Sequence, residues 1–204
     1  VVAISTGQLA KEDNLSLCAP RPQTRQKAID RMLAVIDLAA RFDTQVNVSN
    51  IRGQLAAPSE KEFARESLRL LDDYASREGV PLVIEPQCRW VINRCNTAGE
   101  TVEFMRSYTD NPRILFDLYH ARLEEQSVYA ALIRAIGAVT YIQVSDSNRL
   151  APGRGVANVG DFLFELGALG YTGWVTVECR QSPDSAHVAQ AAARHLAPYL
   201  PAAS

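Results

Sequence analysis

Short apolar runs alternate with longer amphipathic stretches along the whole chain. Six runs are rich in β-branched residues and have the length of strands, and the stretches between them repeat apolar residues at the offsets of a helix. This alternation predicts βαβ units and a parallel sheet, rather than a sandwich or a helical bundle. Strands are expected over residues 1–5, 45–49, 81–85, 113–117, 139–143 and 173–178, and helices over 29–40, 63–75, 125–136, 159–169 and 185–197.

The spacing of the strands predicts a barrel. Each interval has room for one helix and two loops, and right-handed crossovers then wind the strands around a common axis. A closed barrel of this kind has eight strands and about 250 residues. Six strands in 204 residues therefore predict a single α/β domain over residues 1–204, a TIM-type (β/α) barrel that lacks its first two βα units.

Local motifs predict where some of the helices begin. Ser59 with Glu62, and Thr97 with Glu100, have the spacing of a capping box, in which each side chain binds the other residue's backbone N–H. The pair Ser182–Pro183 has the order of a cap followed by a first helical residue. Helices are therefore expected to start after Ser59, Thr97 and Ser182.

Composition excludes several classes of protein. The net charge is −2, so no strong positive field would hold a nucleic acid, and no apolar run reaches the roughly 18 residues that a membrane span needs. Four cysteines, without a Cys-x-x-Cys pair, indicate free thiols in a reducing compartment. We expect a cytoplasmic protein that binds neither nucleic acid nor membrane.

Polar side chains at the ends of four strands are the main functional signal. In a parallel barrel the carboxyl ends of the strands meet at one mouth, where three carboxylates without a cation would repel one another. Oxygen ligands favour Mg²⁺ or Mn²⁺, although Co²⁺ and Zn²⁺ also bind such a set. For any one residue the simpler interpretation is a cap on the following loop. The four residues are Glu85, Asp117, Gln143 and Glu178.

Four segments around these positions resemble one family of enzymes. Together they are similar to the xylose-isomerase-like sugar isomerase and epimerase barrels, in particular the D-tagatose 3-epimerase branch. The resemblance covers essentially the whole chain and implies that the six strands are the third to the eighth of a full barrel. The segments are Ile84–Arg89, Phe116–His120, Gln143–Arg149 with Pro152–Gly155, and Gly170–Glu178.

The resemblance also implies roles for individual residues. It makes Glu85, Asp117, Gln143 and Glu178 the metal ligands, and it implies that His120 and Arg149 hold substrate oxygens. Without the resemblance, His120 could equally support a loop and Arg149 a surface ion pair.

Two further residues are candidates for the mouth, and two other positions depart from the family pattern. Arg89 and Asn93 are candidates to line the same mouth. The family usually has histidine where Gln143 stands, which puts the metal preference in question. Val91 replaces a second glutamate that the epimerases often carry, so contacts near one end of the sugar are expected to differ.

The expected function is a metal-dependent epimerase or isomerase of keto-sugars or keto-sugar acids. A divalent ion would acidify the carbon beside the carbonyl and stabilise an enediolate. Glu85 and Glu178, on opposite sides of the ion, would then remove a proton from one face of that carbon and return one to the other.

Three alternatives lead to different expectations. Gln143 gives weight to a lyase resembling dehydroshikimate dehydratase, whose product would be a conjugated chromophore. A truncated barrel could also be a binding domain without catalysis, and its open edges would need a partner or a second copy of the chain to cover them. Endonuclease IV shares the fold, but its several zinc-binding histidines cannot come from a chain with three histidines.

Overall fold

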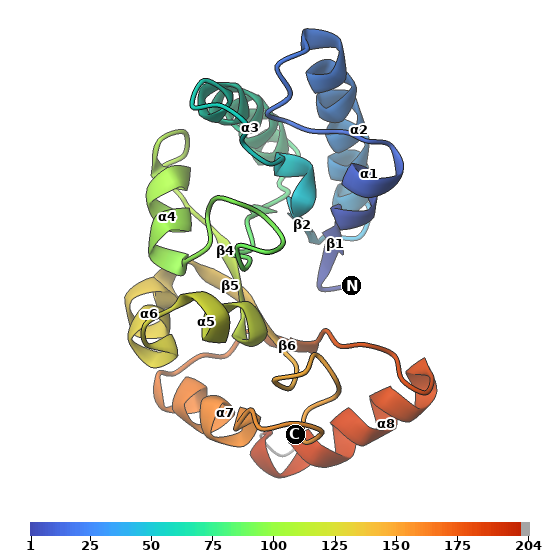
Figure 1. Cartoon of the computed structure of the whole chain (residues 1–204), viewed down its shortest axis with the longest axis vertical. Helices are drawn as coiled ribbons and strands as arrows, with labels where there is room; N and C mark the ends of the chain where they lie inside the picture. The colour runs from blue at the N-terminus through green and yellow to red at the C-terminus, as the bar shows by residue number, and fades with distance from the viewer. Residues whose placement is uncertain (201–204) are drawn as a thin grey trace.

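The structure is a computed structural model that describes residues 1–200 of the chain. Six strands alternate with helices and wind into an open arc (Figure 1). The strands are β1 (Ala3–Ser5), β2 (Gln45–Asn47), β3 (Leu82–Val83), β4 (Ile114–Asp117), β5 (Val139–Val144) and β6 (Trp174–Val177). The helices are α1 (Gly7–Glu12), α2 (Pro22–Ala40), α3 (Glu60–Arg77), α4 (Ala98–Arg106), α5 (Leu118–Glu124), α6 (Val128–Ala135), α7 (Val159–Ala168) and α8 (Ser185–Leu196). All six expected strands are confirmed.

The strands pair in chain order, and every pair is parallel. Two three-stranded sheets, β1-β2-β3 and β4-β5-β6, are joined by a bridge between Ile84 and Ile114. Over residues 1–200, β1 and β6 form no ladder with each other, and the arc is open between them in Figure 1. The parallel α/β architecture is thus confirmed, while the absence of two further units stays a prediction.

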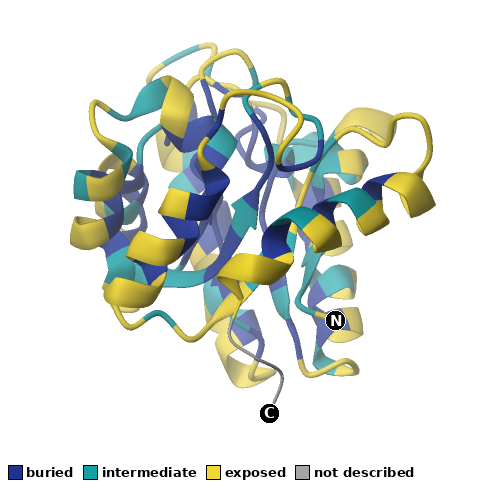
Figure 2. Cartoon of the chain, turned by 90° about the horizontal axis from the view of Figure 1, so that it is seen from below, coloured by how far each residue is buried: buried dark blue, intermediate teal, exposed yellow. Residues whose placement is uncertain are grey.

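Successive strand residues face opposite sides of the arc, as period-two alternation requires. One set, which includes Phe116 and Ile142, packs in the main core with the surrounding helices. The other set forms a separate interior cluster of Val83, Leu115 and Tyr141. Strands β3 and β4 are fully buried, whereas β1 and β6 at the two ends of the arc are partly exposed. Figure 2 shows most exposed residues on the helices and loops.

The helix starts correct two of the expectations from sequence. Thr97 accepts the Glu100 N–H at 3.2 Å and caps α4 as expected, although the Glu100 carboxylate binds other backbone groups. Ser59 makes no side-chain cap, because its own backbone is already helical. The last helix is capped by Asp184 instead of Ser182, so it begins at residue 185. No helix within the described residues is long and apolar enough to span a membrane.

Candidate active site

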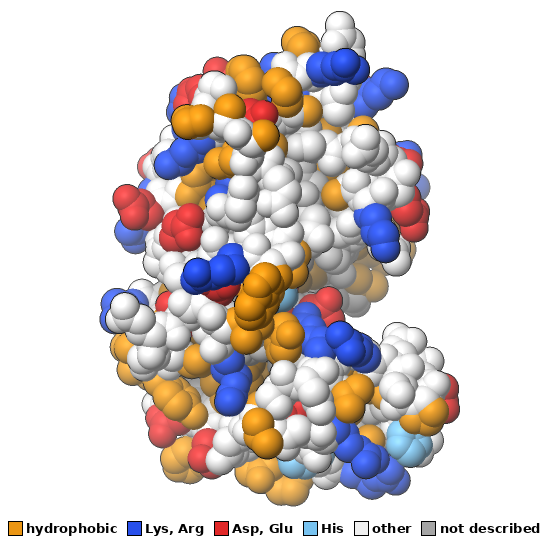
Figure 3. All heavy atoms as spheres, viewed as in Figure 1, with side chains coloured by type: hydrophobic (Ala, Val, Ile, Leu, Met, Phe, Trp, Pro, Cys, Tyr) orange, Lys and Arg blue, Asp and Glu red, His pale blue; other side chains and the backbone are white. Residues whose placement is uncertain are grey.

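A cavity of about 590 Å³ lies at the carboxyl ends of the strands. Three predicted site residues line it, namely Glu85, Gln143 and Glu178, and β1 and β2 supply its opposite wall. The space-filling view in Figure 3 shows the molecule hollowed between its upper and lower parts, with acidic and basic side chains beside the hollow.

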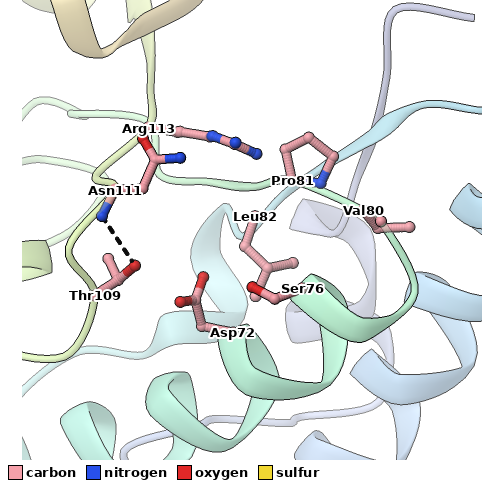
Figure 4. A pocket seen from close by; sticks show the side chains of 9 residues that line it. Asp72, Ser76, Val80, Pro81, Leu82, Thr109, Asn111 and Arg113 are labelled. Carbon is pink, nitrogen blue, oxygen red and sulfur yellow. Dashed lines mark hydrogen bonds between the residues drawn. The ribbon is translucent and has the colours of Figure 1, made fainter.

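A second, smaller cavity of about 200 Å³ lies at the other ends of the strands (Figure 4). Asp72 and Arg113 line it, beside Pro81 and Leu82 at the start of β3. None of the predicted site residues contributes to this cavity. The chemistry suggested by the sequence therefore belongs to the larger cavity.

The alternation of the strands explains why the predicted donors lie on one side of the arc and at one end of it. Because side chains two residues apart share a face, each donor extends the interior face of its strand toward the mouth. Asp117 lies beside Gln143 in the β4–β5 register, and Gln143 lies beside Thr176 in the β5–β6 register. Each donor lies two positions after a residue of the same strand that faces the interior. The pairs are Val83 and Glu85, Leu115 and Asp117, Tyr141 and Gln143, and Thr176 and Glu178.

Glu85 is a buried carboxyl group with one free oxygen. Its Oε2 accepts from Asn47 Nδ2 at 3.2 Å and from Gln87 Nε2 at 3.1 Å, whereas its Oε1 has no partner. Burial, followed by the charges of Asp117 and Glu178, raises the pKa of Glu85 to about 8. At neutral pH and without a cation, Glu85 therefore carries a proton.

His120 turns its Nε2 toward this carboxyl group without forming a hydrogen bond to it. Its Nδ1 accepts the backbone N–H of Cys88 at 3.2 Å, so the proton of the neutral ring is on Nε2, which lies 3.6 Å from Glu85 Oε1. Burial lowers the pKa of His120, which favours this neutral form. Potential ligand atoms of Glu85, Asp117 and His120 lie within 4.8 Å of one another, but a protonated Nε2 has no lone pair for a metal.

Arg149 connects two of the predicted ligands. Its Nη1 lies 2.7 Å from Asp117 Oδ2, and its Nη2 lies 2.8 Å from Glu178 Oε2. Asp117 also accepts the backbone N–H groups of Tyr119 and His120 and so caps α5. The guanidinium is thus held in a defined place at the mouth by two strand ends.

Glu178 differs from Glu85 in its exposure. The side chain is 53% exposed, because β6 is the last strand of the arc. Partial burial raises the pKa of Glu178 against the opposing effect of Arg149. The two glutamates are therefore an inner and an outer carboxyl group of one cavity.

Unpaired oxygen atoms show what kind of ligand the cavity fits. Buried polar atoms without partners are unfavourable, and those that belong to the lining residues are all oxygens. Such a lining suits a cation or a molecule rich in hydroxyl donors. Oxygen donors around three carboxyl groups fit a hard divalent cation. The unpaired atoms are Oδ1 of Asn47 and Asn50, Oε1 of Glu85, Oε1 of Gln87 and Oε1 of Gln143.

Sequence reasoning missed the contributions of β2 and the loop after β3. Asn47 and Gln87 hold Glu85 and line the cavity. The position of Asn47 could have been predicted, because Asn47 ends its strand on the same face as Gln45. Gln87 had none, because it lies in a loop whose path is set by distant contacts.

Arg89 and Asn93 are not in the cavity lining of the described structure. Arg89 pairs with Glu124 at 2.8 Å, and its side chain is 69% exposed. The Asn93 side chain binds the backbone N–H and carbonyl of Leu55. Arg89 thus contacts the end of α5, and Asn93 contacts the segment before α3. A role of either residue in substrate binding stays a prediction.

Comparisons with known proteins agree with this arrangement of strands. Residues 1–199 match the family model "Xylose isomerase-like TIM barrel", and the chain belongs to this family. It is 26% identical over 122 residues to 3-dehydro-D-guloside 4-epimerase of Escherichia coli K12, a match covering 59% of this chain and 47% of that protein. It is 30% identical over 120 residues to D-psicose 3-epimerase of Agrobacterium fabrum, covering 57% and 42% respectively. The matches thus span about half the length of these relatives.

Solved structures show the same fold at low identity. The crystal structure of 3-keto-D-glucoside 4-epimerase from E. coli superposes with a TM-score of 0.80 at 20% identity, covering 98% of this chain and 78% of that chain. The structure of L-ribulose 3-epimerase gives a TM-score of 0.76 at 20% identity, covering 100% and 69%.

Proposed function

We propose that this chain carries the active site of a metal-dependent epimerase or isomerase of keto-sugars or keto-sugar acids. The observation that carries the proposal is a cavity at the strand ends that Glu85, Gln143 and Glu178 line and whose unpaired buried side-chain atoms are all oxygens. Asp117 lies beside Gln143 in the strand register. The epimerases among the relatives give independent support. A cavity of about 590 Å³ is also within the usual size range for a small-molecule site.

The proposed cation ligands are Glu85, Asp117, Gln143 and Glu178. A divalent ion, Mn²⁺ or Mg²⁺ by donor type, would polarise a carbonyl and acidify the adjacent C–H group. His120 is excluded from this set by the tautomer that Cys88 imposes. Its Nε2–H is instead a donor for a substrate oxygen, and Arg149 supplies further donors from the other side of Asp117.

Glu85 and Glu178 are the proposed proton-transfer groups. They reach the cavity from β3 and β6, which β4 and β5 separate, so they can address two faces of one carbon. One carboxylate removes the proton beside the carbonyl, and the other carboxyl group returns a proton to the opposite face. The net result is inversion at that carbon without loss of atoms, and the roles exchange in the reverse direction.

A lyase is the second candidate, and Gln143 is the observation that favours it. Gln143 stands where the resemblance leads us to expect histidine, so the proposed donor set differs from that of the usual epimerase. The two reactions differ in their products, since dehydration creates a conjugated chromophore and epimerisation does not.

Deuterium exchange tests the proposal. The chain is incubated with Mn²⁺ and a panel of ketoses and keto-sugar acids in deuterated water, and deuterium beside the carbonyl is measured by NMR. Glu85→Gln and Glu178→Gln should each lower exchange by about 10²- to 10⁴-fold, whereas Glu66→Gln on the exposed face of α3 should not. Metal binding without exchange across the whole panel would contradict an epimerase, and a new ultraviolet chromophore would favour the lyase.

A further inference from the structure

The loop between β5 and α7 contains a buried carboxylate that the proposed chemistry does not use. Asp146 is completely buried, although it lies in a loop of polar and small residues. Its Oδ1 accepts the backbone N–H of Ser147 at 2.7 Å and of Ala157 at 2.9 Å, and its Oδ2 accepts that of Gly153 at 2.8 Å. One carboxylate thus ties together the beginning, the middle and the end of this loop.

The same loop presents Arg149 in an uncommon backbone conformation. Arg149 has a φ of 62°, in the left-handed region that residues other than glycine rarely adopt. Its N–H donates to the carbonyl of Asp146 at 2.9 Å, and its own carbonyl accepts the N–H of Arg180 at 2.6 Å. Such a conformation persists only where its surroundings determine it, and here they are Asp146 and the segment after β6.

The contacts of the guanidinium depend on that backbone position. Besides Asp117 and Glu178, Arg149 Nη1 lies 3.2 Å from Ser145 Oγ, and the guanidinium carbon lies 4.8 Å from the centre of the Tyr119 ring. Because the guanidinium is planar and rigid, a shift of the backbone at residue 149 would break these contacts together. The loop that fixes residue 149 therefore controls where the cationic group stands in the mouth.

We propose that Asp146 is the positioning residue for Arg149, and that the buried carboxylate sets the geometry with which Arg149 meets the substrate. This inference rests on the proposed function of Arg149 in holding a substrate oxygen. Neither Asp146 nor Arg149 is among the residues that line the cavity, but the guanidinium of Arg149 pairs with Glu178, which does line it.

Two substitutions disturb the carboxylate in different ways. Asp146→Asn keeps the shape but replaces one acceptor oxygen by an NH₂ group, which then faces at least one backbone donor. Gly155→Ala keeps the charge, but a Cβ at residue 155 would clash with Asp146 Oδ1 and lie 2.6 Å from Ser147 Oγ. Matched controls are Asp184→Asn at the start of α8 and Gly99→Ala in α4, where a Cβ meets nothing within 4 Å.

Steady-state kinetics with the best ketose of the panel give the first test. Because a hydrogen bond to a charged group is lost, Asp146→Asn and Gly155→Ala should raise KM by about 10- to 100-fold, with a smaller change in kcat. In an Arg149→Ala background the same substitutions should change KM by less than about twofold. The reason is that the effects of substitutions which act through one side chain are not additive. An unchanged KM in the single variants, or fully additive effects, would overturn the proposal.

An NMR measurement separates this inference from the proposed function. Arg149 Nε–H should give a protected side-chain signal in the wild-type chain and in both controls, and the signal should be lost in Asp146→Asn and Gly155→Ala. Circular dichroism verifies that the variants are folded, and Gly155→Ala replaces Asp146→Asn if the latter does not fold. A native Arg149 signal in a folded variant overturns the positioning role, even if the chain turns over no sugar.

Discussion

Cation binding to this site should release a proton, because Glu85 is protonated in the cation-free form. With a pKa of about 8, Glu85 is about 90% protonated at pH 7, about half at pH 8 and about 10% at pH 9. A cation can bind the Glu85 carboxylate only after that proton leaves. The expected release from Glu85 is therefore about 0.9 proton at pH 7 and about 0.1 at pH 9.

The same proton weakens the apparent affinity for the cation. At pH 7 the competition should lower the affinity by about tenfold relative to a pH well above 8, which is about 1.4 kcal/mol. Isothermal titration calorimetry with Mn²⁺, in two buffers of different ionisation enthalpy at each pH, measures both the affinity and the number of protons. Glu178, whose pKa is also raised, adds to the total.

Variants isolate the contribution of Glu85. Glu85→Gln keeps an oxygen ligand but has no proton to lose, so its proton release at pH 7 should be smaller by nearly one, while Glu66→Gln should match the wild-type chain. A Mn²⁺ affinity that is flat from pH 7 to pH 9, with the same heat in both buffers, would refute the reasoning, because it would mean that Glu85 is not the titrating ligand.

Further predictions concern stability. Without a cation, the raised pKa of Glu85 stabilises the folded chain fully below about pH 4.5, and this stabilisation is lost as the pH rises through about 8. The free energy of unfolding from thermal denaturation should therefore fall with pH by at most ~1.4 kcal/mol per pH unit in the wild-type chain. Glu85→Gln should lack this slope. Phe116→Ala removes a buried ring stacked on Phe162 and should lower the free energy of unfolding in urea by about 3–5 kcal/mol, unlike a substitution of exposed Phe42. Thr97→Ala should lose about 1 kcal/mol, whereas Ser59→Ala, which removes no cap, should stay within about 0.5 kcal/mol in the same titration.

The strands and the donors at their ends could be predicted from the sequence because both follow local rules. Buried parallel strands are continuous β-branched runs, and period-two alternation places Asp117 and Gln143 on the interior face once the strand is known. The cap at Thr97 follows the same kind of local rule. Ser59 has identical spacing, but its backbone is already helical and cannot take the extended conformation of a capping residue.

The contacts between distant segments could not be predicted. The tautomer of His120 is set by the backbone of Cys88, which is 32 residues away in the chain. The ion pairs of Arg149 with Asp117 and Glu178 span three strands. Residue type and spacing identify which side chains reach the mouth, but such pairings depend on loop conformations that only the assembled barrel defines.

The central claim is that four strand ends hold one divalent cation, and an anomalous scattering measurement tests it most directly. In crystals of the chain soaked with Mn²⁺, a difference map at the manganese edge should contain one strong peak at roughly 2.0–2.6 Å from side-chain oxygens of all four ligands. The four oxygens belong to Glu85, Asp117, Gln143 and Glu178. A peak bound by His120 Nε2 in place of Gln143, or no peak in the cavity at saturating Mn²⁺, would contradict the account.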